Sequence, residues 1–294
     1  MNTFKEYFSP CKVNYLLAIN EPREDGFHNL TSLVAPINFG DSLKIKIANS
    51  NKDSLICNME GVPCNESNLV IKAAILFRQK TNIEKYFDFE LIKRVPHGAG
   101  LGGGSSNGAI ALKAINELCG SPLNIDELSD ISAQMGSDCP LFLRGEAVIM
   151  KGRGEVIQNL SKQAVDCIKS IELLVFKPAF SINTGQAYKA MRESKAFYIT
   201  PEDTNKMLEP WLANPSIATL PLYNNMQEAA SVKYPAIEVV LNKLKAEFNV
   251  PCLMSGSGSA CFVVINGLSK EKIEEIKKAI IADLGESVFI GELK

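Results

Sequence analysis

The feature that most constrains the fold of this 294-residue chain is the glycine-rich segment Pro96–Ser106, with the sequence PHGAGLGGGSS. It follows a charged strand pattern and opens an apolar helix pattern, and it contains five glycines and two serines. At a helix N-terminus such a segment exposes several backbone N–H donors, and the helix dipole favours an anion there. Each glycine costs about 0.5–1 kcal/mol of backbone entropy, and a tight turn alone would need only one or two. The segment therefore predicts a polyphosphate-binding loop, with a purely structural turn as the alternative.

Three known glycine motifs can be aligned with this segment, and each fails in its surroundings. Gly98, Gly100 and Gly103 fit the dinucleotide fingerprint G-x-G-x-x-G, but the following helix leads into another helix instead of a strand that ends in an acidic residue. Gly104–Gly108 fits the hydrolase pattern G-x-S-x-G, but both histidines of the chain precede that serine, whereas the hydrolase fold places its histidine last. No lysine follows the final glycine, as a Walker loop requires.

Composition excludes several classes of protein. Lys and Arg number 31 against 33 Asp and Glu, so the net charge of −2 lacks the basic surplus of a nucleic-acid or anionic-membrane binder. The N-terminus shows no signal-peptide pattern, and the uncharged stretch 249–269 is broken by a proline and by glycines, so we expect no membrane helix. The eight cysteines contain no C-x-x-C, and with only two histidines a structural zinc site is not expected. These features predict a cytoplasmic protein with reduced thiols.

Hydrophobic periodicity predicts an α+β protein of two domains. The length suits two domains, since a domain commonly has about 100–200 residues. Strands and helices intermix in both halves, and we place the boundary near 158–168, which gives domains over 1–162 and 163–294. A polar stretch is expected to run to about residue 221. The predicted helices are 68–80, 105–119, 124–135, 184–192, 236–248 and 270–284, the strands are 43–48, 86–91, 171–176 and 261–265, and a hairpin is expected over 147–157.

The glycine-rich segment resembles the second motif of the galactokinase, homoserine kinase, mevalonate kinase and phosphomevalonate kinase superfamily. The rest of the chain is similar to one branch of it, the 4-diphosphocytidyl-2-C-methyl-D-erythritol kinase family, and the resemblance covers essentially the whole chain in the expected order. The segments that carry it are Ser9–Leu17 (SPCKVNYLL), Asp25–Leu30 (DGFHNL), Gly136–Leu143 (GSDCPLFL), Tyr223–Gln227 (YNNMQ) and Met254–Phe262 (MSGSGSACF).

The resemblance implies a fold and a reaction. The fold is an N-terminal domain like ribosomal protein S5 domain 2, followed by a ferredoxin-like C-terminal domain. The reaction is phosphoryl transfer from ATP, with Mg²⁺, to the 2-hydroxyl of the methylerythritol unit of a cytidine diphosphate ester, in the non-mevalonate isoprenoid pathway. We expect these small molecules to be its partners, with no nucleic acid or membrane partner, and we expect a monomer or a homodimer.

Two residues match the catalytic positions of the family. Asp138 matches the base that accepts the hydroxyl proton; by its sequence context alone it would instead shape an Asx-turn into Pro140. Lys12 lies in an otherwise apolar strand, where a lysine usually faces solvent. The resemblance implies that Lys12 lies beside Asp138, keeps that carboxylate ionised and neutralises charge on the phosphoryl oxygens.

The implied nucleotide site comprises the glycine-rich segment and a second, shorter loop. The second loop has as its alternative a plain turn before the strand at 261–265. No residue is assigned to a metal. The implied ATP-binding residues are Pro96, His97, Gly98, Ala99, Gly100, Leu101, Gly102, Gly103, Gly104, Ser105, Ser106, Gly256, Ser257 and Gly258.

The implied substrate-binding residues are Asn14, Phe27, His28, Thr184 and Tyr188. Asn14 points to the same side of its strand as Lys12, two residues earlier, and would bond the substrate. His28 would read the cytosine edge, Phe27 would wall the pocket, and Thr184 and Tyr188 would close over the base. A structural hydrogen bond is the alternative for His28, and a helix core position is the alternative for Tyr188.

The chain departs from the family pattern in two places. YNNMQ has Asn225 and Gln227 where acids are commoner, and Phe27 replaces a commoner tyrosine. Two rival hypotheses remain: another kinase of the superfamily, acting on mevalonate or homoserine, and a non-catalytic relative that only binds a nucleotide or sugar. The DGFHNL segment argues against the first, and the presence of both Lys12 and Asp138 argues against the second.

Overall fold

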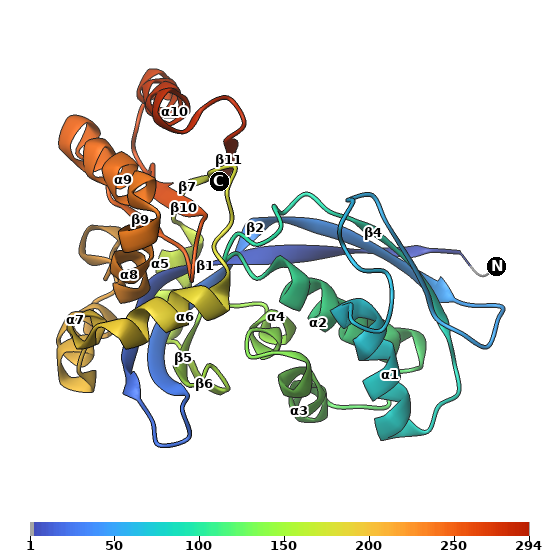
Figure 1. The fold of residues 1–294 in the computed structure, drawn as a ribbon. Helices are drawn as coiled ribbons and strands as arrows, with labels where there is room; N and C mark the ends of the chain where they lie inside the picture. The colour runs from blue at the N-terminus through green and yellow to red at the C-terminus, as the bar shows by residue number, and fades with distance from the viewer. Residues whose placement is uncertain (1–2, 294) are drawn as a thin grey trace. The chain divides into compact units, whose positions relative to one another are not determined.

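The computed structural model describes residues 3–293, apart from the side chain of Lys195, and combines helices with two separate sheets (Figure 1). The predicted α+β class is confirmed. The residues group into two compact units whose segments alternate along the chain. Unit 1 comprises Met1–Lys12, Pro36–Val95 and Gly102–Glu146, and unit 2 comprises Val13–Ala35, Pro96–Leu101 and Ala147–Lys294. The domain boundary after residue 162 stays a prediction.

The sheet of unit 1 contains two short strands and parts of two long strands that also run into unit 2. The strand bounds are β1 Lys5–Pro22, β2 His28–Ile47, β3 Ser54–Cys57 and β4 Phe87–Ile92. The order is β3-β4-β2-β1. Strand β4 alternates buried and half-buried residues, so that buried Phe89 lies opposite buried Ile45 and buried Leu91 lies opposite buried Leu43. The predicted strands 43–48 and 86–91 are confirmed as parts of β2 and β4.

Four helices of unit 1 lie together on one side of this sheet (Figure 1). They are α1 Leu69–Thr81, α2 Gly103–Leu118, α3 Ile125–Met135 and α4 Cys139–Arg144. Helix α2 packs closely on its neighbours at Gly108, where an added Cβ would lie 2.7 Å from the Cβ of Leu69 and 2.6 Å from the Cε of Met135. Because α2 begins inside the glycine-rich segment, this packing fixes the helix on which the end of that segment depends.

Unit 2 contains a four-stranded antiparallel sheet in the order β11-β7-β10-β9. The bounds are β7 Leu173–Lys177, β9 Cys252–Met254, β10 Cys261–Val264 and β11 Phe289–Leu293. Its apolar residues join those of the surrounding helices in one core, to which the N-terminal residues Leu17 and Ile19 also belong. The helices of unit 2 are α5 Lys162–Lys169, α6 Thr184–Glu193, α7 Pro201–Ala213, α8 Asn225–Lys233, α9 Pro235–Phe248 and α10 Lys270–Leu284, with two 3₁₀ turns at Lys195–Phe197 and Ile217–Thr219.

The long strands complete unit 2. Strand β2 pairs with β5 (Val148–Gly152), which forms a hairpin with β6 (Val156–Asn159). Strand β1 pairs in parallel with β8 (Tyr223–Asn224), where Leu16 lies opposite Tyr223. The predicted hairpin over 147–157 is therefore confirmed.

Helix predictions from periodicity are confirmed for α1, α2, α3, α6, α9 and α10, with ends within two residues. The polar stretch expected before residue 221 contains a helix, α7, that was not predicted. The sequence did carry a signal for this helix: Thr200 caps the backbone N–H of Asp203, and Pro201 stands at the first helical position. Helices α5 and α8 and the short α4 were also missed.

Two expectations from composition concern cysteines and membranes. All eight cysteines are free thiols, as predicted, and only Cys64 is exposed. None of the helices within 3–293 is long and apolar enough to span a membrane.

Candidate active site

Backbone geometry accounts for three of the five glycines in the glycine-rich segment. Gly98, Gly100 and Gly102 adopt φ angles of 63°, 74° and 67°, in the left-handed region that other residues rarely adopt. Gly100 also packs tightly within unit 2, where an added Cβ would lie 2.5 Å from the carbonyl oxygen of Ser255. The structural-turn alternative thus explains more glycines than the one or two expected, but not all of them.

Gly104 has neither constraint and lies open to solvent at the start of α2. Its φ is not positive, and an added Cβ would have no atom within 4 Å. Among the described residues no side chain caps α2 from its N-cap Gly102, and no acidic residue occupies the first turn. The first intrahelical bond reaches the N–H of Ser106, at 2.9 Å from the Gly102 carbonyl, so the three N–H groups before it have no carbonyl within the helix. Such an uncapped helix N-terminus suits a phosphate group.

Lys12, on β1 in unit 1, is 5% exposed and lies against the glycine-rich segment. A Cβ on Gly102 would lie 3.0 Å from its Cγ and 3.3 Å from its Cε, so glycine at this position makes room for the lysine stem. Burial lowers the pKa of Lys12 from its usual value, and the negative charge of Asp138 acts in the opposite direction. The alternative of a solvent-facing strand lysine is therefore wrong, and the structure brings Lys12 within electrostatic range of Asp138.

Asp138 is half-buried at the N-cap position of α4, also in unit 1. Within the described part of the chain its side chain makes no capping hydrogen bond to this helix, so it is not used for the turn into Pro140. The next residue, Cys139, is buried, and both its thiol and the hydroxyl of Ser105 in the first turn of α2 lie beside Gly136, where an added Cβ would be 3.6 Å and 3.9 Å from them. Burial raises the pKa of Cys139 to about 12, which keeps it a neutral thiol. The Asp138 turn thus lies beside the first turn of α2.

The second predicted loop, residues 256–258, packs within unit 2 against the first half of the glycine-rich segment. The N–H of Ala260 donates to the carbonyl of Ala99 at 3.0 Å. Asn224 holds the loop from the other side, where its Nδ2 donates to the carbonyls of Met254 at 2.8 Å and of the first loop glycine at 2.9 Å. The alternative of a structural turn is satisfied here, and a nucleotide contact stays a prediction.

His28 lies between two tyrosine rings in unit 2. Its ring centroid is 5.4 Å from that of Tyr188 and 5.3 Å from that of Tyr198, at interplanar angles of 25° and 29°. Its Nδ1 lies 3.0 Å from the carbonyl oxygen of Asn20, which can only accept, so Nδ1 carries the proton and Nε2 of the neutral ring is an acceptor. That Nε2 is buried and has no hydrogen-bond partner among the described residues. A buried polar atom without a partner is costly, which makes it a candidate for ligand contact.

Tyr198 is a candidate binding residue that the sequence analysis missed. Its ring stacks on His28, and its buried hydroxyl also lacks a hydrogen-bond partner within the described residues. It stands 170 positions after His28 in a polar stretch with no motif, so no sequence signal could have paired the two.

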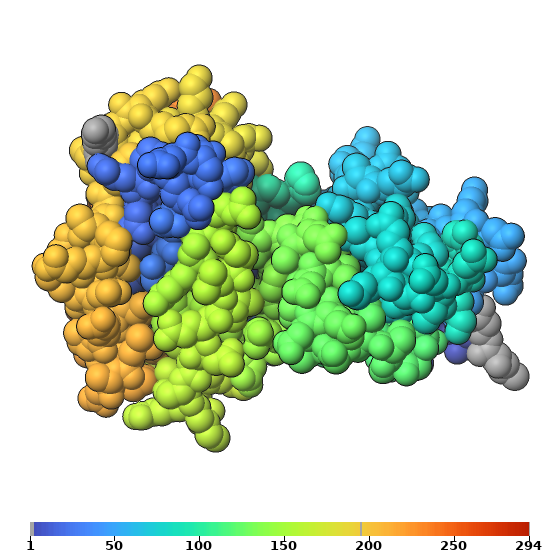
Figure 2. Space-filling view, turned by 90° about the horizontal axis from the view of Figure 1, so that it is seen from below, coloured from blue at the N-terminus to red at the C-terminus, as the bar shows by residue number. Residues whose placement is uncertain are grey.

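The other predicted substrate residues are placed in unit 2 with different surroundings. The Asn14 side chain donates to Ser32 at 2.8 Å, and the Thr184 hydroxyl lies 2.9 Å from that of Ser257. Phe27 is 54% exposed, with the Arg153 guanidinium 4.9 Å from its ring centroid. Figure 2 shows the turn between β1 and β2, in blue, beside the green β5–β6 hairpin on the surface. The predicted site residues therefore form two groups, one in each unit.

The two residues of YNNMQ that depart from the family pattern, Asn225 and Gln227, have structural partners. Asn225 accepts from the N–H of Ile19 at 2.9 Å and donates to the carbonyls of Ile19 and Phe197, both at 2.8 Å. Gln227 accepts from the N–H of Met254 at 2.9 Å. An aspartate at 225 could not donate, so the departure from the commoner acid fits the backbone it meets here.

No group of three or more His, Cys, Asp or Glu side chains in residues 3–293 is arranged to hold a metal ion.

Comparison with known proteins identifies two families of domains and several similar chains. Residues 68–146 match the family described as GHMP kinases N terminal domain, and residues 214–286 match GHMP kinases C terminal. The 4-diphosphocytidyl-2-C-methyl-D-erythritol kinase of Methylacidiphilum infernorum is 33% identical over 285 residues, covering 96% of this chain and 94% of its own length. That of Protochlamydia amoebophila is 34% identical, covering 88% of this chain and 84% of its own.

A solved structure agrees with these relatives, and the plant relatives are longer. The crystal structure of a 4-(cytidine 5'-diphospho)-2C-methyl-D-erythritol kinase superposes with a TM-score of 0.76 at 28% identity, covering 98% of this chain and 99% of the other. The chloroplastic enzyme of Arabidopsis thaliana is 38% identical over 257 residues. The chain spans 46–65% of the lengths of the four plant relatives. On the bacterial relatives and the two GHMP domains, this chain belongs to the 4-diphosphocytidyl-2-C-methyl-D-erythritol kinase family of the GHMP kinases.

Proposed function

We propose that this chain transfers the γ-phosphoryl group of ATP to the 2-hydroxyl of 4-diphosphocytidyl-2-C-methyl-D-erythritol. The observation that carries the proposal is the buried Lys12, which lies against Gly102 of the glycine-rich segment and within electrostatic range of Asp138. A buried lysine costs stability, and it serves a kinase by placing positive charge where phosphoryl oxygens gather. The substrate is proposed from the relatives, which are 4-diphosphocytidyl-2-C-methyl-D-erythritol kinases.

The residues divide the chemistry among them. Asp138 accepts the proton of the attacking hydroxyl, and Lys12 neutralises phosphoryl charge. The open first turn of α2 at Gly104 binds phosphate through its backbone N–H groups. A Mg²⁺ ion bound with ATP would offset the negative charge of its phosphate groups. The protein works as a cytoplasmic enzyme, in keeping with its eight free thiols.

The cytidyl end of the substrate is read by His28. The Nε2 acceptor of its neutral ring matches the exocyclic amino group of cytosine, which is a hydrogen-bond donor. The flanking Tyr188 and Tyr198 hold the imidazole in one plane, so that the acceptor direction is fixed.

A coupled assay of ADP release tests this function against its rivals. We expect turnover with the cytidine diphosphate ester, and kcat/KM lower by at least about 100-fold with free methylerythritol phosphate, mevalonate or homoserine. Preference for mevalonate or homoserine would assign the chain to another kinase of the superfamily. ATP binding without turnover of any of the four would support the non-catalytic alternative.

A His28→Phe variant tests the cytosine contact separately. The phenyl ring keeps the stack with both tyrosines but has no acceptor at Nε2, so KM for the cytidyl ester should rise about 5–150-fold, while KM for ATP stays within about twofold. Equal effects on both substrates would contradict the assignment of His28 to the cytidyl end.

A further inference from the structure

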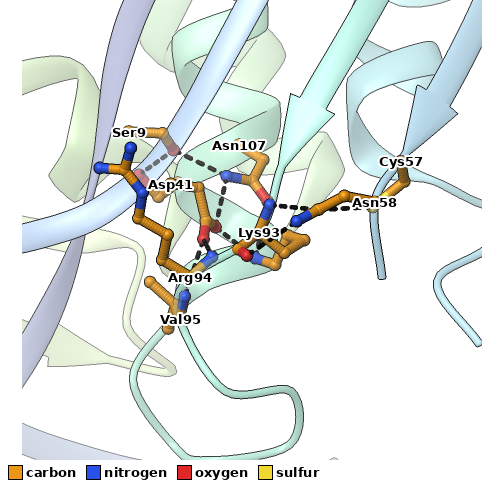
Figure 3. Close-up of polar contacts among 9 residues, drawn as sticks. Ser9, Asp41, Cys57, Asn58, Lys93, Arg94, Val95 and Asn107 are labelled. Atoms are coloured by element: carbon orange, nitrogen blue, oxygen red, sulfur yellow. Dashed lines mark hydrogen bonds and ion pairs between the residues drawn. The ribbon is translucent and has the colours of Figure 1, made fainter. Parts of the chain in front are cut away.

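One buried carboxylate in unit 1 bonds to backbone and side chains on both sides of the glycine-rich segment (Figure 3). Asp41, on β2, is 0% exposed. Its Oδ1 accepts from the backbone N–H groups of Arg94 at 2.7 Å and Val95 at 2.9 Å. Its Oδ2 accepts from the Nζ of Lys93 and from the Nδ2 of Asn107 at 2.9 Å. Four donors therefore converge on one buried side chain.

The same network continues to β1 and into the first turns of α2. Lys93 donates to the Oδ1 of Asn107 at 3.0 Å, and Asn107 donates to the Oγ of Ser9 at 2.8 Å. The hydroxyls of Ser9 and Ser106 are 2.8 Å apart. All of these residues are buried, with exposures from 0% to 8%. Low dielectric strengthens such bonds and makes the loss of a partner costly.

The position of these partners in the sequence is the informative feature. Lys93–Val95 end immediately before the glycine-rich segment, and Ser106–Asn107 lie at its end and just beyond it. The eleven-residue segment Pro96–Ser106 is therefore anchored at both ends through Asp41. The first residue of α2 also lies close to the network, since a Cβ on Gly103 would be 3.2 Å from the Nζ of Lys93.

We propose that Asp41, with Lys93 and Asn107, is a positioning group that sets the distance between the two ends of the glycine-rich segment and so aims the first N–H groups of α2 at the phosphates of ATP. This role rests on the proposed function. Hydrogen bonds from backbone N–H groups to phosphate act over a narrow range of geometry, and a displacement of about 1 Å can cost on the order of 100-fold in rate. A buried ion pair is in general a poor source of stability, so its place here calls for a reason other than stability.

Unit 1 contains a second ion pair, Asp53 with Arg78, which does not anchor the glycine-rich segment and therefore allows a comparison. Asp53 accepts from Arg78, at 3.1 Å to Nη1 and 2.5 Å to Nη2, and from the backbone N–H of Phe87 at 3.0 Å. Its side chain is 6% exposed, and like Asp41 it receives both a cation and a backbone donor on an adjoining segment. Asp53→Asn is therefore the control for the loss of a buried charge as such.

The experiment compares Asp41→Asn with Asp53→Asn in the full chain. The measurements are the midpoint of thermal unfolding, KM and kcat for each substrate, and competitive inhibition constants for adenosine and ADP. We expect both variants to unfold at lower temperature. Asp41→Asn should in addition raise KM for ATP and the inhibition constant of ADP by about tenfold or more. The inhibition constant of adenosine and the KM for the cytidyl ester should stay within about twofold in this variant. Neither of them depends on the α2 N–H groups that face the phosphates of ATP.

Each outcome decides the role. The positioning role is overturned if KM for ATP and the inhibition constant of ADP are the same in Asp41→Asn and Asp53→Asn. It is also overturned if Asp41→Asn weakens the binding of adenosine and of ADP equally. If Asp41→Asn does not fold, Ser9→Ala removes only the hydroxyl that bridges Ser106 and Asn107. A rise in KM for ATP of about threefold or more in that variant supports the role, and an unchanged KM overturns it. An unmodified chain that binds no ATP overturns the proposed function itself, whereas ATP binding with no selective loss in the variants overturns the positioning role alone.

Discussion

At the scale of single residues, the buried amine of Lys12 is held at a cost to stability. Burial lowers its pKa below the usual 10.5, while Asp138 only partly offsets that effect. A Lys12→Met change removes the charge and keeps an unbranched stem of similar length. We expect the variant to lose kcat by about 10²–10³-fold and yet to unfold at a higher temperature than the unmodified chain at pH 7. Thermal unfolding and steady-state rates measured side by side test this, and a variant that is both inactive and less stable would contradict it.

The higher stability expected for Lys12→Met should depend on pH in one direction. Because the pKa of Lys12 is lower in the folded chain than in the unfolded chain, the unfolded chain binds more protons between the two values. The free energy of unfolding contributed by this group therefore rises with pH through that interval, up to about the unfolded value of 10.5. The stability advantage of Lys12→Met should be largest below the folded pKa of Lys12 and should shrink as the pH rises toward 10.5, as measured by denaturant titrations across the range.

Asp138 allows a direct test of proton transfer. Asp138→Asn keeps the size of the side chain but cannot take the hydroxyl proton, so kcat should fall by about 10²–10⁴-fold with both substrates still bound. Calorimetry gives the two binding constants, and the coupled assay gives kcat. Asp130→Asn, at an exposed position on α3 of the same unit, is the control and should retain activity. Near-normal kcat in folded Asp138→Asn would remove this residue from the mechanism.

At the scale of elements, the glycine-rich segment separates glycines that shape the chain from one that stays open. Valine at Gly102 would be strained at a φ of 67° and would press on Lys12 and Phe142. Valine at Gly103 would meet Val95 and Lys93 at 3.1–3.2 Å. Lost ATP binding in either variant would thus have several causes. Only Gly104 in this segment combines an unstrained φ with open space around its Cβ.

Gly104→Val is therefore the sharper test of the phosphate site. The helix should tolerate the side chain, and the midpoint of unfolding should change little, since glycine costs more backbone entropy than other residues. The Cβ points toward the helix N-terminus and would obstruct a phosphate there, so ATP affinity should fall about tenfold or more. Calorimetry with ATP measures it, and unchanged affinity in the folded variant would show that phosphate binds elsewhere.

At the scale of the whole molecule, the two units cannot be separated by one cut in the chain. Leu17 and Ile19 belong to the core of unit 2, and Asn225 hydrogen-bonds to both backbone groups of Ile19. We expect a fragment of residues 163–294 to lack a cooperative thermal transition, even if a domain boundary lies there, because it would expose this core and remove both hydrogen bonds between Asn225 and Ile19. Circular dichroism of the fragment beside the full chain tests this. A cooperative transition near that of the full chain would show that β1 is dispensable to unit 2.

Local signals predicted the elements well where the physics is local. Asn124 and Glu127 form the capping box that starts α3, and strand β4 alternates as its sequence indicates. Prediction failed where structure depends on partners far along the chain. The two residues of β8 exist as a strand only because Leu16 and Leu17 lie beside them. Helix α7 is a different case, because its Thr200 cap is a local signal that was overlooked within a polar stretch.

The candidate site divides in the same way. The glycine-rich segment could be recognised from its sequence because its function depends on backbone freedom, which composition reveals. Lys12 and Asp138 were found only through the resemblance to a family, since an isolated lysine or aspartate has no local signature. Tyr198 and Asp41 had no signal at all, because their roles arise from contacts that span 170 and about 50 to 70 positions.

The sequence by itself determined an α+β protein and predicted a backbone-lined anion site at the start of one helix, because hydrophobic periodicity and glycine content act over a few residues. Tertiary structure alone decided which polar groups are buried and which of them have partners. It buried Lys12 near Asp138, left the Nε2 of His28 without a partner among the described residues and gathered four donors on Asp41. The physical reason is that the cost of burying charge, and the hydrogen bonds that offset it, depend on neighbours that the chain brings together only when it folds.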